Sequence, residues 1–174
     1  MSEQATAAFE VGDVGHVPVV GDQAPRTDNL LPGASDAPVT AVDSRAEEDG
    51  SVPDPELHDT TIESAISAGR PVMIVVSTPV YCVSRFCGPI TDTVQDLAVE
   101  FGDDMAFVHL EVWRDFENNA INKAAAEWIW PDQTGDPGEP WVFVVDGSGK
   151  IAARWDNVVT DQNLDDAVQD VLGG

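Results

Sequence analysis

The sequence predicts an α/β fold in which helices cover both faces of a mixed central sheet. From residue 58 onward, short apolar runs of strand length alternate with helical segments in the order α-β-α-β-α-β-β-α. Helices separate the first three of these runs, so crossover connections and parallel pairing are expected where those strands are neighbours. The last two runs are separated by the tight turn Asp146-Gly147-Ser148-Gly149, which predicts an antiparallel pair.

The first helix and the first strand have clear boundary signals. Thr60-Thr61-Ile62-Glu63 fits a capping box, in which a hydroxyl and a Glu three residues later serve the free backbone amides. The helix is expected to end at Gly69, with Pro71 just beyond it. The run from Val72 to Val76 is continuously apolar and mostly β-branched, which is typical of a strand buried on both faces.

The main helix is expected to open at Pro89 and to end at Gly102, because proline favours a first helical turn and glycine an end. Its apolar stripe consists of Ile90, Val94, Leu97, Ala98 and Phe101. The remaining expected elements are a strand over 106–113, a helix over 119–130, strands over 141–145 and 150–155, and a final helix capped by Thr160.

Residues 1–57 differ in composition from the domain expected over residues 58–174. They contain 12 acids interleaved with Gly, Pro, Ala, Thr and Ser, and they show neither a 2-residue nor a 3.6-residue apolar period. We interpret them as an acidic arm that is extended or partly disordered.

The charge of the whole chain restricts its partners. The 32 acidic and 8 basic residues give a formal net charge of −24, which disfavours binding to nucleic acids and to anionic membrane surfaces. No apolar run is long enough for a transmembrane helix, and the first 30 residues lack the pattern of a signal peptide. Because 20 of the acids lie outside the arm, the domain itself is expected to be acid-coated. This predicts either the cytoplasm of a high-salt organism or an extracytoplasmic setting, with a signal or anchor missing from this sequence.

Both cysteines lie in the segment from Ser77 to Pro89, between the first strand and the main helix. Active sites in open α/β sheets lie at the carboxyl ends of the strands, and the amino end of a helix favours a thiolate over a thiol. If a helix ran through both cysteines, five residues would place Cys82 and Cys87 about 140° apart. A non-helical loop would instead allow the two sulfurs to meet.

These features resemble the thioredoxin superfamily over roughly residues 60–172. The resemblance is carried by the strand, cysteine loop and helix, by Tyr81 directly before the first cysteine, and by Glu139-Pro140 before the third strand. The loop is also similar to that of bacterial thioredoxin-like proteins with a Thr-Pro-x-x-Cys-x-Ser-x-x-Cys-Gly-Pro pattern.

The resemblance implies a thioredoxin-like fold and thiol–disulfide exchange with the thiols or disulfides of protein partners. In that role Cys82 would attack and Cys87 would resolve the mixed disulfide. Pro140, in the cis form, would bind the partner together with Tyr81 and Trp141. Neither a cofactor nor a metal is implied, and the oligomeric state is left open.

Two departures keep other functions open. Thioredoxins have two residues between their cysteines and this chain has four, and Cys87-Gly88-Pro89-Ile90 also aligns with their Cys-Gly-Pro-Cys motif. Which cysteine attacks is therefore undecided, and a redox-inert interaction module with a structural disulfide is an alternative.

Some peroxiredoxins also place four residues between their cysteines, so a thiol peroxidase is another alternative, although Thr78 is one residue out of their register. Copper-delivery proteins of this fold have a different cysteine spacing. His109 lies mid-strand and is expected to be a core residue rather than a metal ligand.

Overall fold

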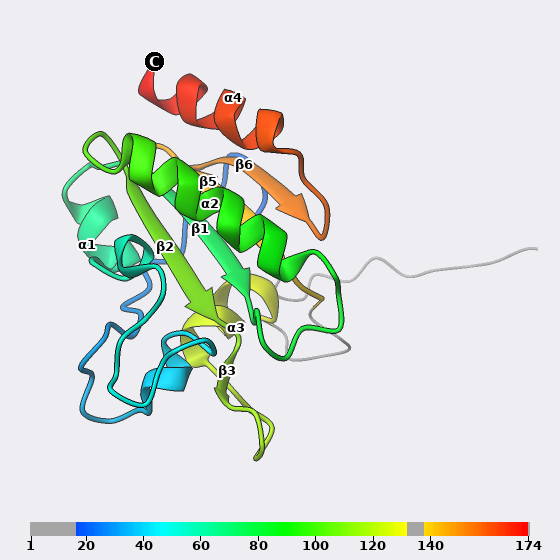
Figure 1. The fold of residues 1–174 in the computed structure, drawn as a ribbon. Helices are drawn as coiled ribbons and strands as arrows, with labels where there is room; N and C mark the ends of the chain where they lie inside the picture. Colours follow the sequence, from blue (N-terminus) through cyan, green and yellow to red (C-terminus); the bar gives the residue numbers. More distant parts are fainter. Residues whose placement is uncertain (1–16, 132–137, 174) are drawn as a thin grey trace, which may run out of the picture.

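A computed structural model describes residues 17–131 and 138–173 and forms one layered domain (Figure 1). Its elements are the 3₁₀ helices η1 (Val39–Ala41) and η2 (Pro55–Leu57), the helices α1 (Ile62–Ser67), α2 (Cys87–Phe101), α3 (Lys123–Ile129) and α4 (Asp161–Leu172), and the strands β1 (Val72–Ser77), β2 (Ala106–Glu111), β3 (Trp113–Asp115), β4 (Ala120–Ile121), β5 (Trp141–Val145) and β6 (Ile151–Asp156). Among the described residues, no helix has the length and apolar composition needed to cross a membrane.

The predicted mixed sheet is present, with strand order β2-β1-β5-β6. Side chains alternate along the central strand β1, so that Met73 and Val75 face α2 and α4 while Val72, Ile74 and Val76 face α1 and α3. Every residue of β1 is buried because both faces are covered by helices. The β5–β6 pair is antiparallel, as the short turn predicts.

The direction of β5 differs from the prediction. β1 and β2 are parallel, but β5 runs antiparallel to β1, with Val76 paired with Trp141. The hairpin β3–β4 and the short helix α3 follow β2 at the end of the sheet where β2 finishes. The chain therefore returns into the sheet from that same end, which places the start of β5 beside the carboxyl end of β1.

Several element ends also differ from the expected positions. Thr61, not Thr60, caps α1, and its side chain accepts a hydrogen bond from the amide of Ser64. The strand expected to reach residue 113 stops at Glu111, and α3 is shorter than expected because Asn122 caps it. Helix α2 begins at Cys87, so Pro89 lies inside its first turn.

The N-terminal segment, residues 17–57, has little regular structure but packs against the domain. Backbone hydrogen bonds join Gly21 and Asp22 to Ile151 of β6, each at 2.9 Å. At the other side of the molecule η2 packs against β2, and Leu57 is fully buried there. The division of the chain at residue 57 stays a prediction, whereas the described part of this segment is docked rather than free.

Candidate active site

A disulfide joins Cys82 to Cys87 in the loop between β1 and α2. The segment between the two cysteines is non-helical, so the two sulfurs meet as the spacing allowed. The amide of Cys82 donates a hydrogen bond to the carbonyl oxygen of Thr78 at 2.9 Å, which turns the loop back on itself. Cys87 is the first residue of α2 and is fully buried, while Cys82 is partly exposed. A molecule arriving from solvent therefore reaches Cys82 first.

The Glu139–Pro140 peptide bond is cis, and it lies next to the disulfide. Because β5 begins beside the carboxyl end of β1, this peptide is brought to the same edge of the sheet as the cysteine loop. A carboxylate oxygen of Glu139 and the two cysteine sulfurs all lie within 4.8 Å of one another. The sequence pointed to Pro140 but gave no reason to expect a carboxylate against the sulfurs.

The two aromatic residues predicted to bind a partner lie in different surroundings. Tyr81 stacks on Phe116, with ring centroids 4.0 Å apart and planes 3° apart. Trp141 is half-buried and stacks on Phe143, and the guanidinium of Arg154 lies 5.6 Å from the centroid of the Trp141 indole. Tyr81 thus stays at the surface, whereas Trp141 belongs partly to the core.

An apolar surface surrounds the exposed side of the loop. Its members are Val80, Tyr81, Val83 and Phe116, all large hydrophobic residues that are exposed. Val83, which directly follows Cys82, is fully exposed. Phe116 comes from the segment between β3 and β4, and its proximity could not be read from the sequence.

Behind the disulfide, a chain of buried side-chain hydrogen bonds leads from α2 to β2. The Thr91 hydroxyl donates to the carbonyl oxygen of Cys87 at 2.8 Å, and it also lies 2.8 Å from the Ser77 hydroxyl. Nε2 of His109 lies 3.2 Å from that Ser77 hydroxyl and 3.1 Å from the Ser77 carbonyl oxygen. His109 is buried in the core, as expected.

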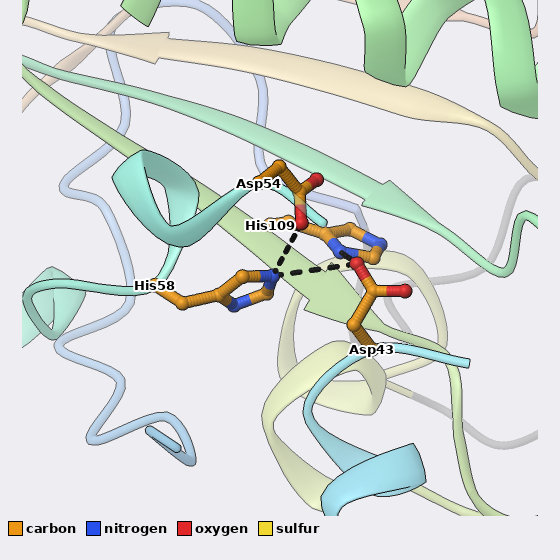
Figure 2. Close-up of side chains that lie close together, drawn as sticks. All are labelled: Asp43, Asp54, His58 and His109. Atoms are coloured by element: carbon orange, nitrogen blue, oxygen red, sulfur yellow. Dashed lines mark ion pairs between the residues drawn. The ribbon is translucent and has the colours of Figure 1, made fainter. Parts of the chain in front are cut away.

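His109 also belongs to a buried polar cluster that the sequence did not reveal, which consists of Asp43, Asp54, His58 and His109 (Figure 2). Asp43 and Asp54 belong to the N-terminal segment, His58 follows η2, and His109 lies on β2. Arg45 forms ion pairs with both carboxylates, at 2.7 Å to Asp43. Three of these residues lie within or next to an aperiodic segment, so no sequence pattern marks them.

Burial and ion pairing shift the pKa values of the cluster in opposite directions. Burial alone would lower the pKa of His58, but the carboxylates of Asp43 and Asp54 outweigh it and raise that pKa. Burial alone would raise the pKa of Asp43, but His109, His58 and Arg45 hold that pKa far below its usual range. The carboxylate of Asp43 is therefore ionised within the protein interior.

Ser44 connects the N-terminal segment to the active-site edge. Its amide donates to a carboxylate oxygen of Glu111 at 2.9 Å. Glu111 lies at the end of β2 and is buried, and this burial raises the pKa of its carboxyl group.

Comparisons with known proteins support the fold. No model of a known protein family matches the sequence, and no curated protein matches it. Among solved structures, a thiol:disulfide interchange protein from Bacteroides sp. matches with a TM-score of 0.53 and 15% identity, over 91% of this chain and 93% of that chain. A putative thiol:disulfide interchange protein DsbE from Chlorobium tepidum matches with a TM-score of 0.52 and 15% identity, over 90% of this chain and 99% of that one. The predicted thioredoxin-like fold is thereby confirmed.

Proposed function

We propose that this thioredoxin-like chain is a thiol–disulfide oxidoreductase whose Cys82–Cys87 pair exchanges with the thiols or disulfides of protein partners. The observation that carries the proposal is the pairing of a partly exposed sulfur with a fully buried one at the helix start, opposite a cis-proline. The two solved structures named above have the same fold and are interchange proteins by name, which supports the proposal.

In the direction that reduces a partner, the Cys82 thiolate attacks one sulfur of the partner disulfide. The partner's S–S bond breaks, one partner thiolate leaves, and a mixed disulfide with Cys82 forms. The Cys87 thiolate then attacks the Cys82 sulfur, and the second partner thiolate leaves. Two electrons pass to the partner, and the two protons from the cysteine thiols end on the partner's thiols. The opposite direction follows the same steps in reverse.

Glu139 is the proton acceptor that we assign to Cys87. Its carboxylate lies within 4.8 Å of both sulfurs, so a proton transfer through a single water is within reach. Cys87 is buried and so has poor access to solvent bases, and a nearby carboxylate would supply the base that the resolving step needs.

A partner's extended chain would lie along the Pro140 edge, with Tyr81 and Trp141 on either side. The exposed apolar surface around Cys82 supports this placement, because apolar groups of a partner could be buried against Val80 and Val83. The net charge of −24 favours partners that are neutral or basic around their reactive sulfur. Thiol peroxidase activity stays an untested alternative.

We further propose that the chain works either outside the cytoplasm or in the cytoplasm of a high-salt organism. A disulfide persists most readily in oxidising compartments, and acid-rich surfaces suit concentrated salt because salt screens their self-repulsion. Expression of the gene in its native host, followed by cell fractionation, distinguishes the two settings.

The decisive experiment equilibrates the chain with a series of glutathione ratios and counts free thiols. A reduction potential above roughly −300 mV supports exchange, and a value far below it identifies a structural disulfide and overturns the proposal. In parallel, the Cys87→Ser variant should accumulate a stable mixed disulfide with a disulfide-containing peptide through Cys82. The Cys82→Ser variant is the matched control, and it should react far more slowly because its remaining thiol is buried.

A further inference from the structure

We propose that Asp43, Asp54, His58 and His109 form a binding site for one divalent transition-metal ion, with Zn²⁺ as the best fit. The four residues offer two imidazole nitrogens and two carboxylate oxygens, all within 4.8 Å of one another. Zn²⁺ takes four such ligands in structural sites. The proposal is independent of disulfide exchange, and it departs from the expectation that the chain holds no metal.

The ligand atoms are buried, and all of them except Oδ2 of Asp43, which accepts from Arg45, lack a hydrogen-bond partner. Each of the four residues is at most 3% exposed. Oδ1 of Asp54, Nδ1 of His109 and both ring nitrogens of His58 make no hydrogen bond. Buried polar atoms are rarely left without a hydrogen bond, and here these atoms have only ion-pair contacts of 3.2–3.4 Å with one another. Figure 2 shows that the four side chains point toward one another, so a single ion between them would satisfy one donor atom of each residue.

The tautomer of His109 strengthens this assignment. A carbonyl oxygen can only accept a hydrogen bond, so the 3.1 Å contact with the Ser77 carbonyl requires a proton on Nε2 of His109. In the neutral imidazole, Nδ1 then carries a lone pair. That nitrogen faces the Oδ2 atom of Asp43 at 3.2 Å, a contact that needs either a second ring proton or a metal cation between the two atoms. A backbone acceptor that fixes the second ring nitrogen is the usual support of a metal-bound histidine.

The distances between donors match a tetrahedral zinc shell. With Zn–N and Zn–O bonds of about 2.0–2.1 Å, neighbouring ligand atoms are separated by about 3.3–3.4 Å. Nε2 of His58 lies 3.4 Å from Oδ2 of Asp43 and 3.4 Å from Oδ1 of Asp54. Together with the 3.2 Å separation at His109, three edges of the tetrahedron are already in place.

Arg45 supports the carboxylates from outside the proposed site. Its backbone amide and Nε donate to Oδ1 of Asp43, and Nη2 donates to Oδ2 of Asp43 at 2.7 Å and to Oδ2 of Asp54. Oδ1 of Asp54 therefore stays available and is held toward His58. Arg45 neutralises one of the two carboxylate charges, and a divalent cation would replace the ring protons of the histidines rather than add to them.

With four protein ligands and no open position, the ion would be structural rather than catalytic. It would fasten the N-terminal segment, through Asp43 and Asp54, to His109 on β2. The consequence is a higher stability of the docked segment when the metal is bound.

The test uses the full chain with its disulfide intact, stripped of metal by a chelator and titrated with Zn²⁺ and Co²⁺ alone. We expect one equivalent of bound ion, a tetrahedral Co²⁺ spectrum without thiolate-to-cobalt charge transfer, and a rise in Tm with Zn²⁺ concentration. Less than one equivalent of bound Zn²⁺, or no rise in Tm, overturns the proposal.

Variants separate this site from the cysteines, which with Glu139 form a second group of possible ligands. His58→Gln should weaken Zn²⁺ binding by at least about 100-fold, since loss of supporting residues alone costs 10–100-fold. Asp92→Asn, which changes an exposed carboxylate near Arg45, and the Cys82→Ser/Cys87→Ser double variant should bind as the wild type does. Equal affinity in His58→Gln, or loss in the double variant, contradicts the assignment. If His58→Gln does not fold, X-ray absorption spectroscopy of Zn²⁺-loaded wild type tests the assignment. A zinc coordination shell that contains sulfur, or that lacks two imidazoles, overturns the proposal.

Discussion

The side-chain oxygen of Ser44 accepts a hydrogen bond from the backbone amide of Val80 at 3.3 Å, so the N-terminal segment directly braces the cysteine loop. Ser44→Ala should therefore lower the free energy of unfolding by about 0.5–1.5 kcal/mol, the usual net value of one hydrogen bond. Amide exchange at Val80 should accelerate as well, because the amide loses its acceptor. The bond from the Ser44 amide to Glu111 is kept in this variant. Ser35→Ala, at an exposed serine of the same segment, is the control, and equal exchange in both variants would refute the bracing role.

Glu139→Gln should slow the resolving step, because the amide cannot accept the proton of Cys87. General-base assistance typically contributes about 10²-fold or more, so a loss of that order is expected. The measurement is the rate at which a preformed mixed disulfide on Cys82 is released at several pH values. Glu139→Asp should recover part of the rate, and the exposed Glu117→Gln should leave it unchanged. A Glu139→Gln variant with the wild-type rate and pH profile would remove Glu139 from the mechanism.

The stacked pair of Tyr81 and Phe116 should contribute measurable coupling energy. A double-mutant cycle with Tyr81→Ala and Phe116→Ala is expected to give about 0.5–1.5 kcal/mol in the free energy of unfolding. Urea denaturation of the four proteins measures it. The same variants should bind a hydrophobic disulfide peptide more weakly if this surface docks partners. Additive effects of the two substitutions would mean that the stacking is energetically neutral.

Asp146 should make the β5–β6 turn sensitive to acid. Its Oδ1 accepts hydrogen bonds from the Ser148 amide and hydroxyl and from the Lys150 amide, at 2.8, 2.7 and 3.1 Å. Burial alone would raise the pKa of Asp146, but these bonds and the Lys150 charge lower it below its ordinary value. The ionised carboxylate therefore stabilises the fold above the unfolded-state pKa of about 4, and this contribution is lost as the pH falls through the folded-state pKa.

Asp146→Ala should accordingly cost about 1 kcal/mol at pH 7, and the difference from the wild type should shrink near pH 3. Urea denaturation at the two pH values gives the comparison. Asp103→Ala, at an exposed acid, should show no such change. A gap that widens on acidification would reverse the expected sign and rule out the explanation.

Stability should rise with salt because like charges face each other between α2 and α4. A groove there is lined by Asp96 and Glu100 of α2 and by Asp161 and Asp165 of α4. The screening length falls from about 10 Å at 0.1 M salt to about 3 Å at 1 M, which removes most of this repulsion. Tm should increase between 0.05 and 2 M KCl, and Glu100→Gln/Asp165→Asn should reduce the increase. Glu117→Gln is the control and should keep the full salt dependence of Tm. If the double variant keeps it too, the acidic residues of the groove do not cause it.

The sequence predicted those parts of the fold that local patterns control. The β-branched run from Val72 to Val76 could only be a buried strand, and the turn after Asp146 required an antiparallel return. The direction of β5 was mispredicted, because it depends on where the preceding connection lies in space and not on any local pattern. The spacing of Cys82 and Cys87 indicated a loop that could bring their sulfurs together.

The buried polar cluster could not be predicted from the sequence either, because it also depends on tertiary packing. Asp43 and Asp54 lie in a segment without periodicity, where an acid is normally solvated. Their burial is compensated by pairing with Arg45, His58 and His109, and residues 43 and 109 are brought together only by tertiary packing. Glu139 is similar, since its nearness to the sulfurs depends on the strand order.

The docked N-terminal segment also lies against the two edge strands of the sheet. A four-stranded open sheet has two edges, and unpaired edge strands are templates for pairing with other chains. Here residues 21–24 form hydrogen bonds with residues 149–151 at the start of β6, while η2 packs against β2, so one segment contacts both edge strands. A chain that loses this segment by proteolysis would keep its cysteines but lose these contacts with both edge strands, and unpaired edge strands favour aggregation. The same segment therefore contacts both the edge strands of the sheet and the cysteine loop.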